Sequence, residues 1–175
     1  MLLAEHAALR DEILRRSDHR VTILVGSLTV SAALLGVGVE RRSAPLLLVL
    51  PLIASLFGLL IVYHHVAIRE LGRYVANLEP ILAELSGLAG RWEGWESSRS
   101  HAPDRFRRLR VVWHLPIMLV VLLPGLLALS LPWIALPADE RGDLRVLLPL
   151  AVIDVAALLF FVVTYLREGL GKRPS

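Results

Sequence analysis

The sequence predicts an all-α integral membrane protein: a four-helix bundle with an amphipathic helix before the first span and a cytoplasmic helical extension of the second. The 175 residues are 55% hydrophobic, above the share expected of a soluble domain. Four apolar stretches are each long enough to cross about 30 Å of hydrocarbon as a helix. These stretches are Val21–Val39, Ala44–Val66, Val111–Leu136 and Val146–Leu166.

The positive charges predict the topology. Fifteen of the 19 Lys and Arg residues precede the first span, separate the second from the third, or follow the fourth. Because Lys and Arg mark cytoplasmic segments, both termini and the long middle segment should be cytoplasmic. The expected parts are a cytoplasmic amphipathic helix (1–20), a first transmembrane hairpin (21–66), a helical stalk with a basic loop (67–110), a second transmembrane hairpin (111–167) and a cytoplasmic tail (168–175).

The first 40 residues contain two helical patterns. Leu2, Leu9 and Ile13 recur at helical spacing, so Met1–Arg20 should form a short helix that lies on the membrane or packs on the cytoplasmic helices. In the first span, small residues alternate in steps of four and three and therefore share one face, which should pack closely against a neighbouring span or another subunit. This small-residue stripe is Thr22, Gly26, Thr29, Ala33 and Gly36.

The second helix should continue beyond the membrane. Apolar residues follow His65 in steps of three and four, which indicates a heptad seam. The seam consists of Ile68, Leu71, Val75, Leu78, Leu82, Leu85, Ala89 and Trp92. Pro80 falls inside it and should kink or divide the helix. The seam packs either against Met1–Arg20 of the same chain or against another subunit.

The segment before the third span combines aromatic and basic residues. Its members are Trp92, Trp95, Arg105, Arg107, Arg108 and Arg110. The simpler interpretation is an interfacial anchor in which the arginines contact anionic lipid head groups. The alternative is a site for a phosphate-bearing ligand, which arginines and aromatic rings also bind.

A polar layer is expected near the membrane midplane. Counted from the cytoplasmic ends of their spans at 1.5 Å per residue, its members lie roughly 15–20 Å deep. They are Ser31, Ser55, the predicted helix break at Pro124 and Gly125, and Asp154. A carboxylate in hydrocarbon costs several kcal/mol, so Asp154 should face the bundle interior, a subunit interface or water. Two roles remain open: a polar tie hydrogen-bonded to Ser31 or Ser55, or a group on a pore or proton path.

The remaining chemistry is sparse. His64, His65 and His114 approach one depth near the cytoplasmic surface, as an interfacial feature or a gate at the cytoplasmic mouth. The chain has no cysteine, which excludes disulfides and thiolate sites. Walker, HExxH, GxSxG and dinucleotide motifs are missing, and the histidines lack metal-ligand spacing. We therefore expect no enzyme activity, no cofactor and no metal.

Four segments of the first 100 or so residues resemble a widespread family of small, mostly uncharacterised bacterial multi-span membrane proteins. They are "RDEILRRSDHR" (Arg10–Arg20), "PLLLVLP" (Pro45–Pro51), "IVYHHVAIRELGRYVANLE" (Ile61–Glu79) and "GWE" (Gly94–Glu96). The resemblance implies membrane spans with a cytoplasmic helical extension, in the bacterial inner membrane, and no catalytic residues. In architecture, some proteins of this kind resemble membrane effectors of antiphage systems, which open pores when a signal binds.

These patterns favour an oligomeric membrane protein that acts as a pore or channel-like effector gated from the cytoplasmic side. Its expected partners are membrane lipids, further copies of itself, and a cytosolic protein or phosphate-bearing signal, with nucleic acid only as such a signal. The alternative is a non-conducting scaffold that recruits a cytosolic partner through its cytoplasmic helices. A proton-coupled transporter would predict inverted repeats, and the two halves do not match.

Overall fold

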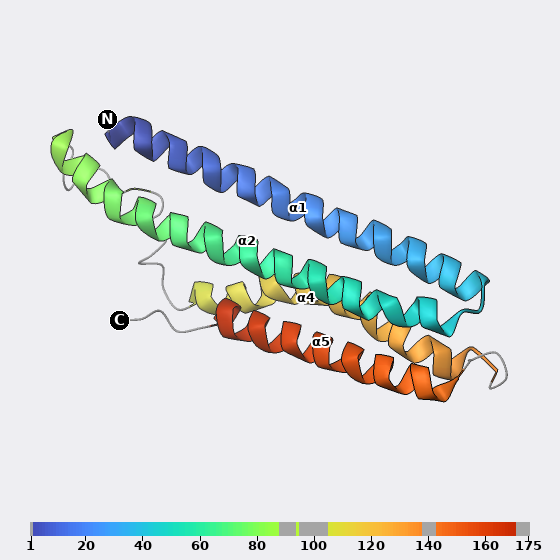
Figure 1. Ribbon diagram of the computed structural model, residues 1–175. Helices are drawn as coiled ribbons and strands as arrows, with labels where there is room; N and C mark the ends of the chain where they lie inside the picture. Colours follow the sequence, from blue (N-terminus) through green and yellow to red (C-terminus); the bar gives the residue numbers. More distant parts are fainter. Residues whose placement is uncertain (1, 88–93, 95–104, 138–142, 171–175) are drawn as a thin grey trace. The chain divides into compact units, whose positions relative to one another are not determined.

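The computed structural model describes residues 2–87, 94, 105–137 and 143–170, and the side chains among them except at 105–114 and 169–170. Every secondary-structure element in this part of the chain is an α-helix, which confirms the predicted all-α class. The helices are α1 (Leu2–Glu40), α2 (Ala44–Leu85), α4 (Arg105–Ile134) and α5 (Leu144–Leu170) (Figure 1).

Each of these helices contains a stretch long and apolar enough to cross a membrane. The four stretches lie within Leu2–Glu40, Ala44–Leu85, Leu115–Ile134 and Leu144–Glu168. All four predicted spans overlap them. The chain is therefore a multi-pass membrane protein built from helices alone in its described part.

The N-terminal helix and the first span form one continuous helix, α1, which corrects the expectation of a separate short helix over Met1–Arg20. No proline or glycine interrupts the first 25 residues, so no local signal ends the helix before the span. Glu12 supports this region through its carboxylate, which lies 2.6 Å from Arg16 Nε and 3.8 Å from Arg15 Nη1. Such pairs at spacings of three and four stabilise helices in solvent.

A tight turn joins α1 to α2. Arg42 adopts the left-handed conformation, with a φ of 49°. The Ser43 N–H donates to the Gly38 carbonyl at 3.0 Å, and the Arg42 N–H donates to the Val39 carbonyl at 3.1 Å. These bonds satisfy carbonyls that the end of α1 would leave without donors, in the manner of a Schellman cap.

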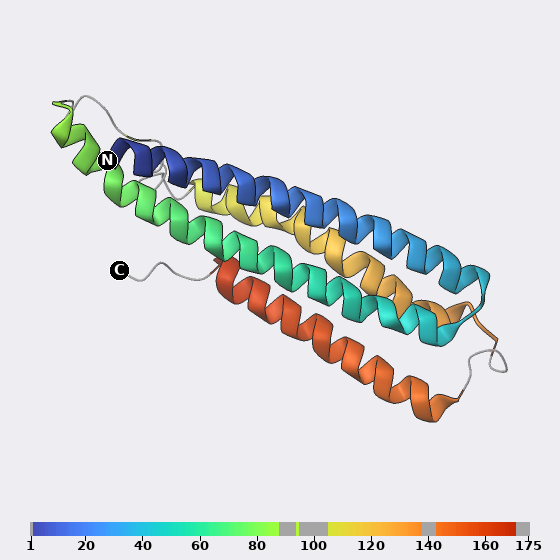
Figure 2. The same cartoon turned by 45° about the horizontal axis from the view of Figure 1, so that its top comes forward.

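The second helix continues well past its apolar stretch, as predicted. It includes Pro80 without being divided, and it ends near Gly87, which has a φ of 69°. Figures 1 and 2 both show its last turns bending away from the line of the helix, as a proline inside a helix would cause. The expected kink is therefore present, but the expected division is not.

The third span is also unbroken. α4 begins at Arg105, six residues before the predicted start, and runs through Pro116, Pro124 and Pro132. The expected break at Pro124 and Gly125 is therefore wrong. Each proline removes one hydrogen bond, yet in a span the surrounding turns and neighbouring protein can keep the helix continuous.

The chain divides into two compact units that share α1 and α2. The first unit consists of Met1–Val21 and Tyr63–Val111, and the second unit consists of Thr22–Val62 and Val112–Ser175. The second unit contains most of the apolar residues of all four spans. Each unit has its own buried residues.

The core of the second unit lies where α2, α4 and α5 meet. At one end Ala44 and Leu48 of α2, Leu136 and Leu147 form a buried cluster. Farther along, close helix approach depends on glycine. A Cβ on Gly58 would lie 2.6 Å from Cε2 of Phe161, so this glycine lets α5 pack directly on α2 (Figure 2).

The core of the first unit forms between the start of α1 and the last turns of α2. Val75, Leu78 and Leu82 of the predicted seam are buried, whereas Leu85 is 70% exposed. Polar contacts join the two helices: the Tyr74 hydroxyl donates to Glu5 Oε1 at 2.9 Å. The seam thus packs within the chain, against the start of α1, as far as Leu82, and its next predicted member, Leu85, does not take part. The expected seam members Ala89 and Trp92 lie outside the described residues.

Candidate functional site

The buried face of α5 places Asp154 in the core of the second unit. Buried residues on this helix occur at steps of seven, four, three and four, which is one helical face. They are Leu147, Asp154, Leu158, Phe161 and Tyr165. Asp154 is at the centre of that face and is 0% exposed. Its side chain therefore faces the interior of a single chain rather than lipid.

The neighbours of Asp154 along the helix show what it faces. Leu147, two turns before it, lies in the buried cluster with Ala44 and Leu136. Leu158, one turn after it, packs against Gly125, where a Cβ would lie 3.2 Å from Leu158 Cδ2 and 3.6 Å from Pro51 Cα. Asp154 is thus between two layers at which α5 contacts both α2 and α4.

The carboxyl group of Asp154 is unpaired. Neither oxygen has a hydrogen-bond partner among the described residues. The proposed tie to Ser31 or Ser55 is therefore not formed. A buried polar group without a partner costs about 1–3 kcal/mol, and a charged group costs more. Asp154 is the group that the core of the second unit leaves least satisfied.

The two serines of the predicted layer are buried beside this region. Ser31 of α1 and Ser55 of α2 are both almost fully covered, and the Ser55 hydroxyl has no hydrogen-bond partner. Helical register places Ser55 one turn from Pro51 on the same face of α2. Ser55 thus lies on the side of α2 that meets Gly125 and Leu158, in the core that also contains Asp154, whereas Ser31 is buried on α1.

The predicted layer is less level than the depth count indicated. Gly125 contacts Leu158, one turn from Asp154, and Pro124 beside it is half-buried. The residue of α2 nearest that contact is Pro51, which the depth count had not included. The depth count began at the end of each span. It therefore ignored how far packing shifts the helices along one another.

The small-residue stripe of α1 faces away from the chain. Its members Thr22, Gly26, Thr29, Ala33 and Gly36 are exposed or half-buried, and nothing lies within 4 Å of a Cβ placed on Gly26 or Gly36. The buried residues of α1 are instead Ser27, Ser31 and Gly38. A Cβ on Gly38 would lie 2.6 Å from Leu47 Cδ2, so this second set of small residues makes the close approach to α2.

The predicted histidines fall in different units: His64 and His65 belong to the first unit and His114 to the second. The His64 ring lies 6.0 Å from the His19 ring and 5.6 Å from the Tyr63 ring, measured between centroids. His65 is half-buried and has an interaction partner. The side chain of His114 lies outside the described residues. Sequence reasoning missed His19 because it precedes the first span and shares no motif with His64.

A second buried acid also escaped the sequence reasoning. Glu79 of α2 is 2% exposed, and its Oε1 atom lies 4.0 Å from Nε2 of His6. Gly94 is buried against it, because a Cβ on Gly94 would overlap the Glu79 carboxyl group. The only indication in the sequence that Glu79 is buried was its position next to Leu78, a member of the seam.

The basic and aromatic cluster is described in part. Arg105, Arg107, Arg108 and Arg110 lie in the first turns of α4, where a loop had been expected. Their side chains, together with Trp92 and Trp95, lie outside the described residues. A head-group anchor or a phosphate site in this segment stays a prediction.

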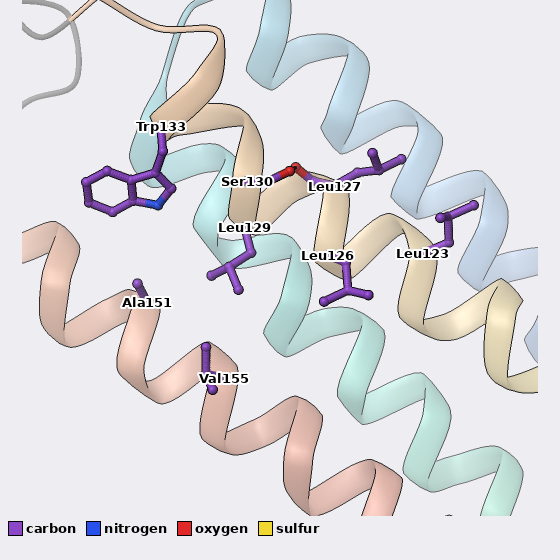
Figure 3. A pocket seen from close by; sticks show the side chains of 8 residues that line it. All are labelled: Leu123, Leu126, Leu127, Leu129, Ser130, Trp133, Ala151 and Val155. Carbon is purple, nitrogen blue, oxygen red and sulfur yellow. Dashed lines mark hydrogen bonds between the residues drawn. The ribbon is translucent and has the colours of Figure 1, made fainter.

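An apolar groove of about 630 Å³ lies between α4 and α5 (Figure 3). Its lining is Leu123, Leu126, Leu127, Leu129, Ser130, Trp133, Ala151 and Val155. The Ser130 hydroxyl already donates to the Leu127 carbonyl at 3.0 Å, so the lining offers little polar chemistry. A groove of this composition suits acyl chains, and Asp154 does not line it.

Comparison with known proteins adds no relative to these observations. No protein-family model, curated protein or solved structure matches the chain.

Proposed function

We propose that the chain is a gated, channel-like ion-conducting protein of the bacterial inner membrane, assembled as an oligomer with both termini in the cytoplasm. One observation carries the proposal: Asp154 is fully buried in a membrane span and has no partner among the described residues. An acid in that position costs several kcal/mol and ties no helices together. An ion that passes through the membrane supplies the missing partner.

The contacts on either side of Asp154 support a closed resting state. The Phe161 ring fills the space over Gly58, and Leu158 packs on Gly125. An ion can reach Asp154 only if these contacts separate, so conduction requires a rearrangement of α5 against α2 and α4. A rearrangement of this kind is a gate.

The first unit is the proposed site of control. It is formed by the ends of α1 and α2, which continue into the spans as unbroken helices. A cytosolic protein or a phosphate-bearing signal that changes the pairing of these helix ends would act directly on the spans. The signal must bind the open and closed forms with different affinities, because otherwise it shifts neither.

The small-residue stripe of α1 supports the oligomer. Gly26 and Gly36 have open space where a Cβ would be, and small residues let two membrane helices approach closely. We assign this face to a second copy of the chain. Gly26→Leu with Gly36→Leu should reduce the native mass in detergent, and a monomeric wild type would remove the oligomer from the proposal.

Conductance in liposomes tests the function itself. The wild-type protein should conduct after addition of cytosolic extract, and Asp154→Asn and Asp154→Leu should each lower the conductance at least tenfold. Asp11→Asn, at an exposed acid of α1, is the matched control and should conduct like the wild type. A wild type that stays silent with every extract would refute the proposal.

A membrane scaffold is the second candidate, and exposed apolar residues of the first unit favour it. Leu3, Ile81 and Leu85 all expose large parts of their side chains. If these residues recruit a cytosolic partner, Leu85→Glu should abolish the growth effect of overproducing the protein, and Asp154→Asn should leave that effect unchanged. A conducting protein predicts the reverse pattern.

A further inference from the structure

Two buried prolines free backbone carbonyls in the core of the second unit. Pro51 of α2 and Pro132 of α4 are both fully buried. Proline has no N–H, so the carbonyl four residues earlier in each helix loses its usual donor. These carbonyls belong to Leu47, which is 1% exposed, and to Ala128, which is fully buried. Both carbonyls are on the core faces of their helices, because each shares the face of a buried proline.

The contacts between helices place the Ala128 carbonyl level with Asp154. Leu129 of α4 packs against the same buried cluster as Leu150 and Ala151 of α5, and Gly125 of α4 meets Leu158. Because the two helices run in opposite directions, Asp154, which lies between Ala151 and Leu158, is level with the turn of α4 from Gly125 to Leu129. The Ala128 carbonyl points along the helix toward Pro132 and reaches this level.

The same contacts place the Leu47 carbonyl at this level. Ala44 and Leu48 of α2 share the cluster with Leu147, and Gly58 meets Phe161. Asp154 therefore lies level with Pro51. The Leu47 carbonyl points toward Pro51, and the Asp154 side chain leans toward the start of α5, as helical side chains do. The carboxyl group and the two carbonyls thus lie within about one helical turn of a common level, which we call the Asp154 layer.

This layer contains more acceptors than donors. It brings together two carboxyl oxygens and two freed carbonyls. The Ser55 hydroxyl, about one turn away, has no hydrogen-bond partner, and the Ser130 hydroxyl already donates to the Leu127 carbonyl. The apolar stretches of the four spans contain no Lys or Arg and no acid other than Asp154, and their histidines, His64, His65 and His114, lie at the cytoplasmic ends of their spans, more than two turns from this layer. A positive charge for this layer must therefore come from solution, and a single carboxylate balances a single charge.

We propose that Asp154 and the backbone carbonyls of Leu47 and Ala128 form a binding site for one monovalent cation, either a proton or Na⁺. A proton bound to Asp154 makes a neutral carboxyl group whose O–H donates to one of the two carbonyls. A bound Na⁺ takes the carboxylate and carbonyl oxygens as ligands, which suit a hard cation. The site deepens the proposed function, because the ion bound here would be the ion conducted, but binding itself does not require conduction.

Infrared spectroscopy of the purified protein in lipid nanodiscs tests the site without measuring conduction. The carbonyl stretch of a protonated carboxyl group should appear in the wild type and be absent from Asp154→Asn. If the band changes with pH alone, the ligand is a proton. If Na⁺ removes the band at constant pH and choline does not, the ligand is Na⁺. Spectra of the wild type that match those of Asp154→Asn under all these conditions would overturn the site.

Proline variants test the two carbonyls. Pro51→Ala and Pro132→Ala restore an N–H that competes for the carbonyls of Leu47 and Ala128. Each variant should therefore raise the cation concentration needed for half-saturation about tenfold, which corresponds to one hydrogen bond to a charged group. Pro124→Ala is the matched control, because it restores an N–H to the Val120 carbonyl, which lies about two turns from the layer. Circular dichroism verifies that each variant is folded. Equal half-saturation in all three variants would overturn the role of the carbonyls.

Conductance of the same preparations separates the two proposals. Cation binding at Asp154 without conductance in liposomes would refute the channel and leave the site intact. Conductance that Asp154→Asn lowers, without a cation-dependent carboxyl band in the wild type, would refute the site and leave the channel intact.

Discussion

Two buried carboxyl groups, Glu79 in the first unit and Asp154 in the second, differ in how they are accommodated. Glu79 has His6 4.0 Å away, further interactions, and Gly94 packed against its carboxyl group. Asp154 has no hydrogen-bond partner for either oxygen among the described residues. Neighbours of this kind hold Glu79 within the fold, whereas we propose that the unpaired Asp154 receives its partner from a ligand. The comparison thus sets an acid that the fold accommodates against one that we propose to be functional.

The largest expected effect is on the stability of the first unit. Glu79→Leu removes the acid that brings α2 against His6 of α1 and against Gly94, and loss of a buried polar group that others contact costs up to about 3 kcal/mol. Thermal unfolding in detergent should shift to clearly lower temperature. Glu84→Leu, at an exposed acid one turn and a half along α2, is the control and should leave the midpoint near that of the wild type. Equal midpoints for Glu79→Leu and the wild type would end the contrast with Asp154.

The opposite sign is expected in the second unit. Asp154→Asn keeps the size of the side chain, removes the carboxyl group and offers N–H donors to the freed carbonyls of Leu47 and Ala128. Because an unsatisfied buried polar group costs about 1–3 kcal/mol, the variant should be more stable than the wild type by about 2 kcal/mol. A higher midpoint together with lost conductance would identify an acid retained at the expense of stability. A lower midpoint would mean that Asp154 supports the fold.

The third effect tests the contacts beside Asp154. Gly58→Ala puts a methyl group against the Phe161 ring, which has little room to move, and overpacking of this kind costs about 1–3 kcal/mol. Gly36→Ala is the matched control on the open face of α1, where nothing lies within 4 Å. Alanine also favours helix over glycine, so the control should be neutral or slightly stabilising. If both variants lose the same stability, α5 does not pack on α2 through Gly58.

Much of this architecture could be predicted from the sequence, because long apolar stretches leave few alternatives to membrane helices. The continuation of α2 was also readable from its seam. The merger of Met1–Arg20 with the first span was not, since the pattern of apolar residues changes at Arg20 although the helix does not end there. Likewise, the first span carries small residues on two faces, and only packing determines that Gly38, rather than Gly26, approaches α2.

The site was harder to predict than the fold. The sequence identified Asp154 as an acid whose burial in a span is costly, but it did not identify the residues that surround Asp154. The depth count assumed that all spans begin at one plane, so it grouped Asp154 with Gly125, which contacts Leu158 instead. Pro51 and Pro132 were visible in the sequence as helix-disturbing residues, but the layer that their freed carbonyls form appears only from the relative register of three helices.

The smallest expected effect concerns an exposed acid, which completes the comparison. The Tyr74 hydroxyl donates to Glu5 Oε1 at 2.9 Å between α2 and α1, with the pair open to solvent. Tyr74→Phe removes this bond without burying an unpaired group, since water can solvate Glu5 in its place. The free energy of unfolding should therefore change by no more than about 0.5 kcal/mol, measured by the same thermal unfolding. A loss of stability as large as that of Glu79→Leu would show that burial does not determine how much a carboxyl contact stabilises this unit. The contrast between Glu79 and Asp154 would then need an explanation other than burial and partners.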